Sequence, residues 1–178
     1  MGTSSEGSAE VRQGLIVPQK IRRVLLAERE DGSSFVAKEE QVEASPFPGV
    51  GELFTLWGAD ETFQLPDAGT EPVIDGTFPP LGGFRVFMTR FAPREDVGTL
   101  SGNMPHDDMP SANDVHSSNT VDVNMVLSGT LDCLLSDGSR ISLQAGDSIV
   151  LNGAAHAWEN NSAEEAVMLF FLVGAKRA

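Results

Sequence analysis

The chain contains three histidines, His106, His116 and His156, the side chains best suited to acid–base or metal chemistry near neutral pH. A polar row follows His116, in which every second residue is polar: Ser118, Thr120, Asp122 and Asn124. Residues of equal parity on a β-strand face the same side. Such a row can line a ligand cavity, coordinate a metal or face solvent, and the residues alone leave these interpretations open.

The separation of His116 and Asp122 limits what they can do together. On a straight strand they lie about 20 Å apart, at ~3.3 Å per residue. They can share one metal ion only if the chain bends or bulges between them.

The elements that must position these residues are short β-strands. β-Prone runs alternate with turns marked by Gly, Pro, Asp-Gly and Asn, and no long helical period is present. Strands are expected at 21–27, 35–38, 51–57, 84–91, 115–127, 131–135, 140–143, 148–151, 155–159 and 166–173. The turns between them include Asp31-Gly32, Ser128-Gly129, Asp137-Gly138, Ala145-Gly146 and Asn152-Gly153. Closely spaced antiparallel strands with glycine corners predict an all-β sandwich or barrel and favour a jelly roll.

The segment 129–160 resembles the second half of a cupin. The Gly-Asp, Gly, His and Asn of the second cupin motif correspond to Gly146-Asp147, Gly153, His156 and Asn160. The first cupin motif corresponds to His116, Ser118, Asp122 and Gly129. The chain is most similar to single-domain cupins with an H-x-T-D-T-x-D-Y-like first motif and a G-x-x-H-A-W second motif. The resemblance implies a cupin jelly-roll β-barrel with an N-terminal β arm. We expect a disordered leader at 1–12, the arm and a loop packed on the barrel at 13–81, and the barrel at 82–178.

In metal-binding cupins two His, one Glu and a further His hold the ion. The resemblance places His116, Asp122 and His156 at three of these positions, as metal ligands and catalytic residues, and Ser118 at the fourth. Two imidazoles and one carboxylate would suit Fe, Mn, Ni or Zn. A Ser hydroxyl is a poor ligand and Asp is one methylene shorter than Glu, so a metal-free site is equally open. Ser118, Thr120, Asn124 and Trp158 are the expected pocket residues.

Each candidate also has a plainer structural interpretation. His116 and His156 could be barrel-interior histidines satisfied by hydrogen bonds, and Asp122 could fix a tautomer without any metal. His106 is by default a solvated loop residue, and the alternative is a cap on the pocket mouth. Either of two strand arginines could anchor a carboxylate ligand or pair on the surface: Arg85 and Arg90.

The charge and the cysteine content limit which partners the protein is expected to bind and in which cellular compartment it is expected to lie. The 178 residues include 26 acidic and 12 basic residues, which gives a net charge of −14. The segment 95–175 contains twelve acidic residues and one basic residue, Arg140. Such a surface repels nucleic-acid phosphates and anionic lipid, so neither is an expected partner. The longest apolar stretch, 166–173, is too short to span a bilayer. The single cysteine, Cys133, excludes a disulfide framework and suits a reducing compartment, so we expect a soluble cytoplasmic protein.

The segments before residue 60 predict self-association. They are β-prone but lie outside a minimal barrel, and a lone hairpin is marginal in water. Nine of the twelve bases lie at or before Arg94, whereas the barrel half is acidic. We therefore expect a homodimer in which the arm contributes to the interface.

The sequence narrows the expected function to the binding of a small molecule inside the barrel. The sequence favours an enzyme acting on a small organic metabolite inside the barrel. Its chemistry would be that of a metal-assisted oxygenase or lyase, or of a His/Asp acid–base isomerase, cyclase or dehydratase. The alternative is a non-catalytic small-ligand-binding or carrier cupin, because the fold does not determine the activity.

Overall fold

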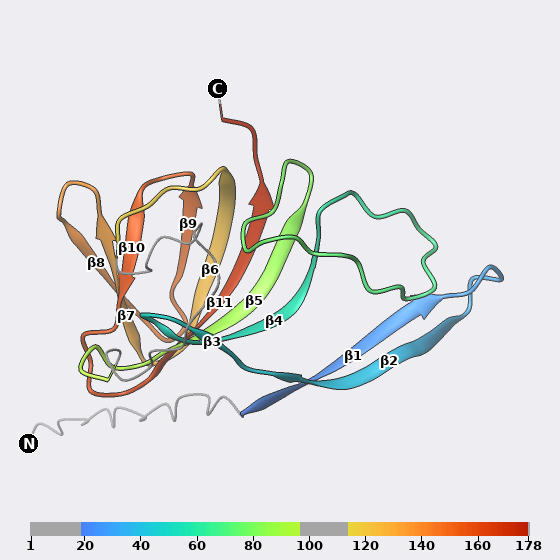
Figure 1. Ribbon diagram of the computed structural model, residues 1–178, viewed down its shortest axis with the longest axis horizontal. Coiled ribbons are helices and arrows are strands. Elements are labelled where there is room, and N and C mark those ends of the chain that lie inside the picture. The colour runs from blue at the N-terminus through green and yellow to red at the C-terminus, as the bar shows by residue number, and fades with distance from the viewer. Residues whose placement is uncertain (1–18, 97–113, 178) are drawn as a thin grey trace, which may run out of the picture.

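A computed structural model describes residues 19–96 and 114–177, and all regular elements in these ranges are β-strands (Figure 1). Within these ranges, no helix has the length and apolar character needed to cross a membrane. The expected leader at 1–12 and the loop residue His106 lie outside the described residues.

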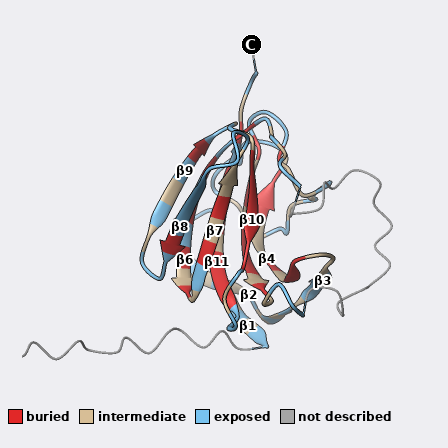
Figure 2. Ribbon diagram, turned by 90° about the vertical axis from the view of Figure 1, so that its left-hand side faces the viewer, coloured by how far each residue is buried: buried red, intermediate tan, exposed pale blue. Residues whose placement is uncertain are grey.

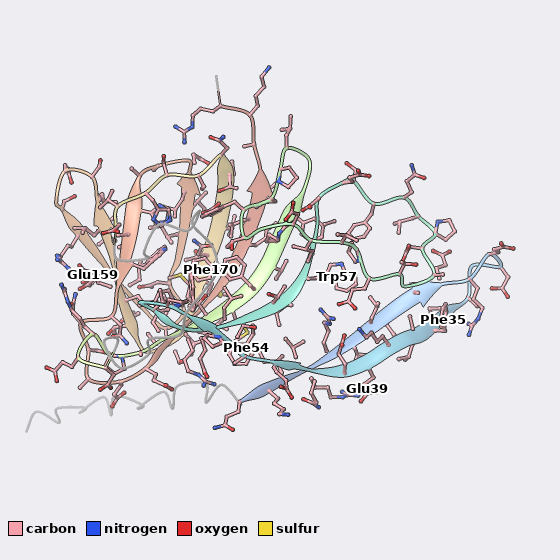
Figure 3. All side chains as sticks on the ribbon, in the orientation of Figure 1. Phe35, Glu39, Phe54, Trp57, Glu159 and Phe170 are labelled. Atoms are coloured by element: carbon pink, nitrogen blue, oxygen red, sulfur yellow. The ribbon has the colours of Figure 1, made fainter. Side chains whose placement is uncertain are left out.

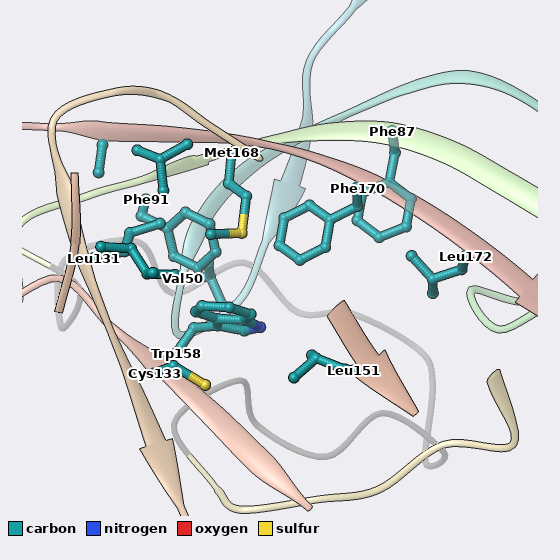
Figure 4. Close-up of a cluster of buried hydrophobic side chains, with 13 residues drawn as sticks. Val50, Phe87, Phe91, Leu131, Cys133, Leu151, Trp158, Met168, Phe170 and Leu172 are labelled. Atoms are coloured by element: carbon teal, nitrogen blue, oxygen red, sulfur yellow. The ribbon is translucent and has the colours of Figure 1, made fainter. Parts of the chain in front are cut away.

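The barrel consists of two antiparallel sheets. The larger has the order β3 (Ser45–Phe47), β4 (Gly51–Ala59), β5 (Phe84–Phe91), β11 (Ala166–Gly174), β6 (Thr120–Ser128), β9 (Ser148–Asn152). The smaller has the order β10 (His156–Glu159), β7 (Thr130–Leu135), β8 (Arg140–Gln144). Side chains from both sheets form one hydrophobic cluster, with Trp158 and Leu131 from the smaller sheet against Met168 and Phe170 from the larger (Figure 4). The expected all-β, jelly-roll-like architecture is confirmed.

Glycines with a left-handed backbone form the predicted corners. Gly32 and Gly138 both have φ of 82°, a conformation that glycine adopts without steric cost. They lie in two copies of the same Asp-Gly-Ser turn, in which the aspartate accepts hydrogen bonds from the backbone and hydroxyl of the following serine. The predicted hairpin at Asp31-Gly32 is thus present, because the hydrophobic alternation and the turn chemistry agree.

The N-terminal arm is this hairpin, β1 (Lys20–Glu28) and β2 (Ser34–Glu43), which projects from the barrel (Figure 1). Arg23 anchors it: its guanidinium donates to the carbonyl of Leu56 at 2.8 Å and lies 5.2 Å from the Trp57 ring centroid. Ile21 and Val42 at the base of the hairpin pack against a cluster around Phe54 on the barrel sheet. Figure 3 shows Phe54 and Trp57 on the side of the barrel that faces the arm.

Two features of the arm differ from expectation. The segment Gly51–Ala59, expected within the arm, pairs with β5 inside the barrel sheet, because its apolar side chains find partners on that strand. The basic residues of the hairpin are paired with acids of the same hairpin, as in Arg22–Glu39 and Lys20–Glu43. Charge therefore supplies less attraction between arm and barrel than the sequence suggested.

The outer face of the larger sheet is apolar and partly uncovered. Residues of odd number on β6 point outward, and Val121, Val123 and Met125 are exposed. Residues on the neighbouring strands continue this outer strip: Val150, Phe171 and Val173. Figure 2 shows exposed segments on β9, at the edge of the sheet. An apolar strip of this kind on one sheet face is a natural contact surface for another copy of the chain.

We expect the full chain to form a homodimer through this strip, and Val123→Asp to weaken it. The new carboxylate would be buried without a partner at the interface, which raises the dissociation constant about tenfold or more. Light scattering across a dilution series measures this, with Gln144→Asp on the smaller sheet as the matched charge control. A mass near 19.0 kDa for the unmodified chain would contradict the dimer.

Candidate functional site

A backbone bridge between the two histidines brings them together. The amide of His116 donates to the carbonyl of His156 at 2.9 Å, and the amide of His156 returns a bond of 2.9 Å to the carbonyl of His116. Their ring centroids are 5.1 Å apart. The chain bends between His116 and the start of β6 at Thr120, so the straight-strand separation from Asp122 does not apply.

Both imidazoles are oriented by main-chain carbonyls. The Nδ1 atom of His116 lies 2.9 Å from the carbonyl oxygen of Asp114, and that of His156 lies 2.9 Å from the carbonyl oxygen of Ala154. A carbonyl only accepts, so Nδ1 carries the proton in both rings and the lone pair of a neutral ring lies on Nε2. Burial lowers the pKa of His156, which favours its neutral form.

The polar row on β6 faces the barrel interior. Thr120, Asp122 and Asn124 are buried, while the odd-numbered residues between them are exposed. The Oδ1 atom of Asp122 and both polar atoms of the Asn124 amide have no hydrogen-bond partner among the described residues. Burial raises the pKa of Asp122, and a hydrogen bond from Thr120 partly offsets this. Unpartnered buried groups of this kind are costly, which marks the row as a place where a ligand or water belongs.

The histidines and Asp122 share a cavity with aromatic walls. It holds about 60 Å³ of space open to the centre of a water-sized sphere, enough for several waters or a compact organic group. Its aromatic lining residues are Phe47, Phe78, Phe87, Phe91, Trp158 and Phe170. Its other lining residues are Thr77, Thr89, His116, Asp122, His156 and Leu172. The rings of Trp158 and Phe170 pack edge to face, with an interplanar angle of 85° (Figure 4). The ring of Phe87 stacks on that of Phe170, with centroids 4.9 Å apart.

Most of the predicted site residues thus lie at one cavity. His116, Asp122, His156 and Trp158 line it. Asn124 is fully buried on the same strand face but is not among the lining residues. Two further predicted pocket residues, Ser118 and Thr120, hydrogen bond to each other through hydroxyls 2.5 Å apart.

Sequence reasoning missed the wall contributed by β5 and the loop before it. Thr89 is fully buried and lines the cavity, its hydroxyl has no hydrogen-bond partner in the described part of the chain, and Phe87 and Phe78 form walls. Because 84–91 is apolar at both parities, its pattern gave no signal of which residues face inward. A polar threonine within such a run was the one available clue.

The two strand arginines do not enter the cavity. Arg85 is buried, and its guanidinium is held by Asp60 and by the carbonyls of Ala59 and Asp75. Arg90 pairs with Glu52. Neither is placed to anchor an anionic ligand there. The lone thiol of Cys133 is fully buried, and burial raises its pKa to about 11, so it is a core side chain as expected.

The donor side chains that the structure describes at this cavity do not form a three-ligand metal centre. Among residues 19–96 and 114–177, no three His, Cys, Asp or Glu side chains converge closely enough to hold one ion. The orphaned Asp122 oxygen and the two imidazoles therefore line the cavity without forming the ligand set that the cupin resemblance implies.

Comparisons with known proteins give distant structural likenesses. Neither a protein-family profile nor a curated protein sequence matches the chain. Among solved structures, the cupin-2 domain of an XRE family transcriptional regulator from Enterobacter cloacae is 18% identical, with a TM-score of 0.36 over 52% of this chain and 83% of that one. A cupin 2 conserved barrel domain protein from Salinispora arenicola is 20% identical, with a TM-score of 0.35 over 52% and 64%. A structure of the DMSP lyases RdDddP and RnDddQII is 17% identical, with a TM-score of 0.44 over 76% and 58%.

These likenesses are distant. The two antiparallel sheets of this chain agree with the jelly-roll-like architecture expected from its sequence. Activity, substrate and cofactor are not carried over from these structures.

The buried carboxylate yields a stability prediction. A folded-state pKa above the ordinary 3.8 means that stability present below pH 3.8 is lost as pH rises through the folded pKa. We expect Asp122→Asn to raise the free energy of unfolding at pH 7 by about 1 kcal/mol, with no gain at pH 3. Denaturant unfolding at both pH values measures this.

Asp137→Asn is the matched control, because hydrogen bonds from Ser139 lower the pKa of Asp137. It should lose stability at pH 7. A loss of stability at pH 7 in Asp122→Asn would show that the carboxylate is paired in the folded protein.

Proposed function

We propose that the chain is a small-molecule cupin-type barrel, an enzyme that transfers protons on a compact organic metabolite bound in the cavity. One arrangement supports this proposal: two imidazoles, each with Nδ1 held by a main-chain carbonyl, line the same aromatic-walled cavity as a buried carboxylate. The Oδ1 atom of that carboxylate, from Asp122, has no hydrogen-bond partner among the described residues. With the Nδ1 proton directed to a carbonyl, the Nε2 lone pair of each neutral ring is left for a bound molecule.

The division of roles follows from burial. His156 is the more buried imidazole, and its lowered pKa keeps Nε2 available as a general base at neutral pH. The Asp122 carboxylate attracts positive charge on both imidazoles, so it stabilises the charge that a ring gains when it takes a proton. His116, half-buried beside His156, would take or return the second proton. Isomerisation, dehydration and cyclisation all require this pairing of a base with an acid.

The aromatic walls serve positioning and water exclusion. Trp158 contacts the His156 ring edge-on at a centroid distance of 5.5 Å, which restricts the rotation of that imidazole. A dry cavity strengthens each polar contact to a bound molecule and limits proton leakage to solvent. The mechanism uses no metal-dependent step, because the donor set does not fit a metal centre.

A non-catalytic carrier is the second candidate, favoured by the small volume and largely aromatic lining of the cavity. A cytoplasmic location is also part of our proposal. It is supported by the single cysteine, Cys133, being buried and free.

A turnover assay distinguishes an enzyme from a carrier. We expect the purified full chain to turn over a member of a small-metabolite panel, and His156→Ala to reduce kcat by about 10²-fold or more. Unchanged thermal unfolding would show that the variant is folded. Ser142→Ala on the smaller sheet is the control for a polar substitution away from the cavity. Saturable binding and thermal stabilisation without turnover across the panel would establish the carrier instead.

The second prediction concerns metal. We expect treatment with a chelator, followed by removal of the chelate, to leave ligand binding and turnover unchanged. Elemental analysis of the same samples would accompany the assay. Loss of activity that a single divalent metal restores, together with metal bound only when His116 and His156 are both present, would contradict the metal-free proposal.

A further inference from the structure

The charge inside the cavity is one-sided. Among the described lining residues Asp122 is the one acid, only 4% exposed, and its Oδ1 has no partner there. No lysine or arginine lines the cavity within residues 19–96 and 114–177. The buried cation on the inner face of β5, Arg85, is engaged by Asp60 and by backbone carbonyls. Among the described lining residues, only the two imidazoles can carry positive charge, and burial disfavours the charged form of His156. A bound anion would therefore face the Asp122 carboxylate with little compensating charge.

The aromatic walls of the cavity can attract a positively charged group. Six aromatic residues line the cavity, and three of them form a contiguous set in which Phe170 contacts both Phe87 and Trp158. The faces of aromatic rings carry negative potential, and they attract alkylated cations most strongly where water is excluded. Figure 4 shows the Trp158 and Phe170 rings turned toward the same interior space.

A metal ion is a poorer match for these walls. Inorganic cations need several oxygen or nitrogen donors, and no three such side chains converge here among the described residues. An organic cation needs only one carboxylate, because its alkyl groups are solvated by the aromatic rings. The net charge of −14 further raises the local concentration of cations near the protein.

We infer that the cavity binds a small organic cation, a substituted ammonium group whose charge lies against Asp122 and whose alkyl groups contact the Phe87, Phe170 and Trp158 rings. This inference rests on the proposed function, since it names the class of molecule on which the two imidazoles would act. The space available limits the buried group to a few non-hydrogen atoms.

Three probes of matched shape test the inference by calorimetry on the full chain. They are choline, its neutral isostere 3,3-dimethyl-1-butanol, and the anion 3,3-dimethylbutanoate. We expect choline to bind about tenfold more tightly than the alcohol, and the anion to bind most weakly. Quenching of Trp158 fluorescence, with Trp57→Phe as background, would place the probe in the cavity.

Substitution of the carboxylate isolates its contribution. Asp122→Asn should weaken choline binding about tenfold and leave binding of the neutral alcohol unchanged. Glu61→Gln is the control, because it removes the same charge from an exposed position that does not line the cavity. It should alter choline binding less than threefold, the residual effect of a screened surface charge.

The outcomes separate this inference from the proposed function. Equal binding of choline and the alcohol, or tighter binding of the anion, would overturn the cation inference while leaving a small-molecule site in place. Turnover of a neutral or anionic metabolite without any choline binding would do the same. Absence of both turnover and binding for the probes and the whole metabolite panel would overturn the two proposals together.

Discussion

The structure depends on a polar row that is held inside the barrel at a cost in stability. Thr120, Asp122 and Asn124 on β6 face inward, while valines and a methionine of the same strand face outward. Burial of amide and carboxylate groups without partners is unfavourable by about 1–3 kcal/mol each. The fold compensates with the aromatic and aliphatic cluster around Trp158 and Phe170, which both sheets share. On most strands the apolar residues face the core and the polar residues face solvent, and β6 has the opposite arrangement. We attribute this arrangement to the polar ligand that its inner face is proposed to contact.

Register keeps that inversion in place. β6 lies between β11 and β9, with Asp122 opposite Leu172 on one side and Leu151 on the other. A slip of one residue would turn the outward valines into the cavity and the carboxylate into solvent, since side chains alternate strictly along a strand. Gly129 helps to fix the register, because its φ of 72° and the 2.7 Å approach of the Glu165 carbonyl to an added Cβ leave no room for a larger residue. The separation of the two histidines is set by the pair of backbone hydrogen bonds between them.

Local signals in the sequence predicted the strands, the Asp-Gly corners and the cupin-type spacing of His116, Asp122 and His156, because turn chemistry and alternation act over a few residues. The direction of the polar row could not be read from β6 alone, since a half-polar strand is compatible with solvent on either face. The same limit applies to β4, whose place in the barrel sheet depends on pairing with β5 across a long connection. The retention of Arg85 by Asp60 and loop carbonyls depends likewise on contacts distant in sequence.

The central claim is that both imidazoles present an unprotonated Nε2 to the cavity, and nitrogen NMR of the side chains tests it most directly. With three histidines in the chain, His106→Gln leaves only the two signals of interest. Long-range proton–nitrogen correlation at a pH where the rings are neutral should show His116 and His156 as the Nδ1–H tautomer, with Nε2 shifts of an unprotonated nitrogen. Protonated Nε2 in either neutral ring would contradict the account, because that nitrogen would have no lone pair with which to take a proton from a bound molecule.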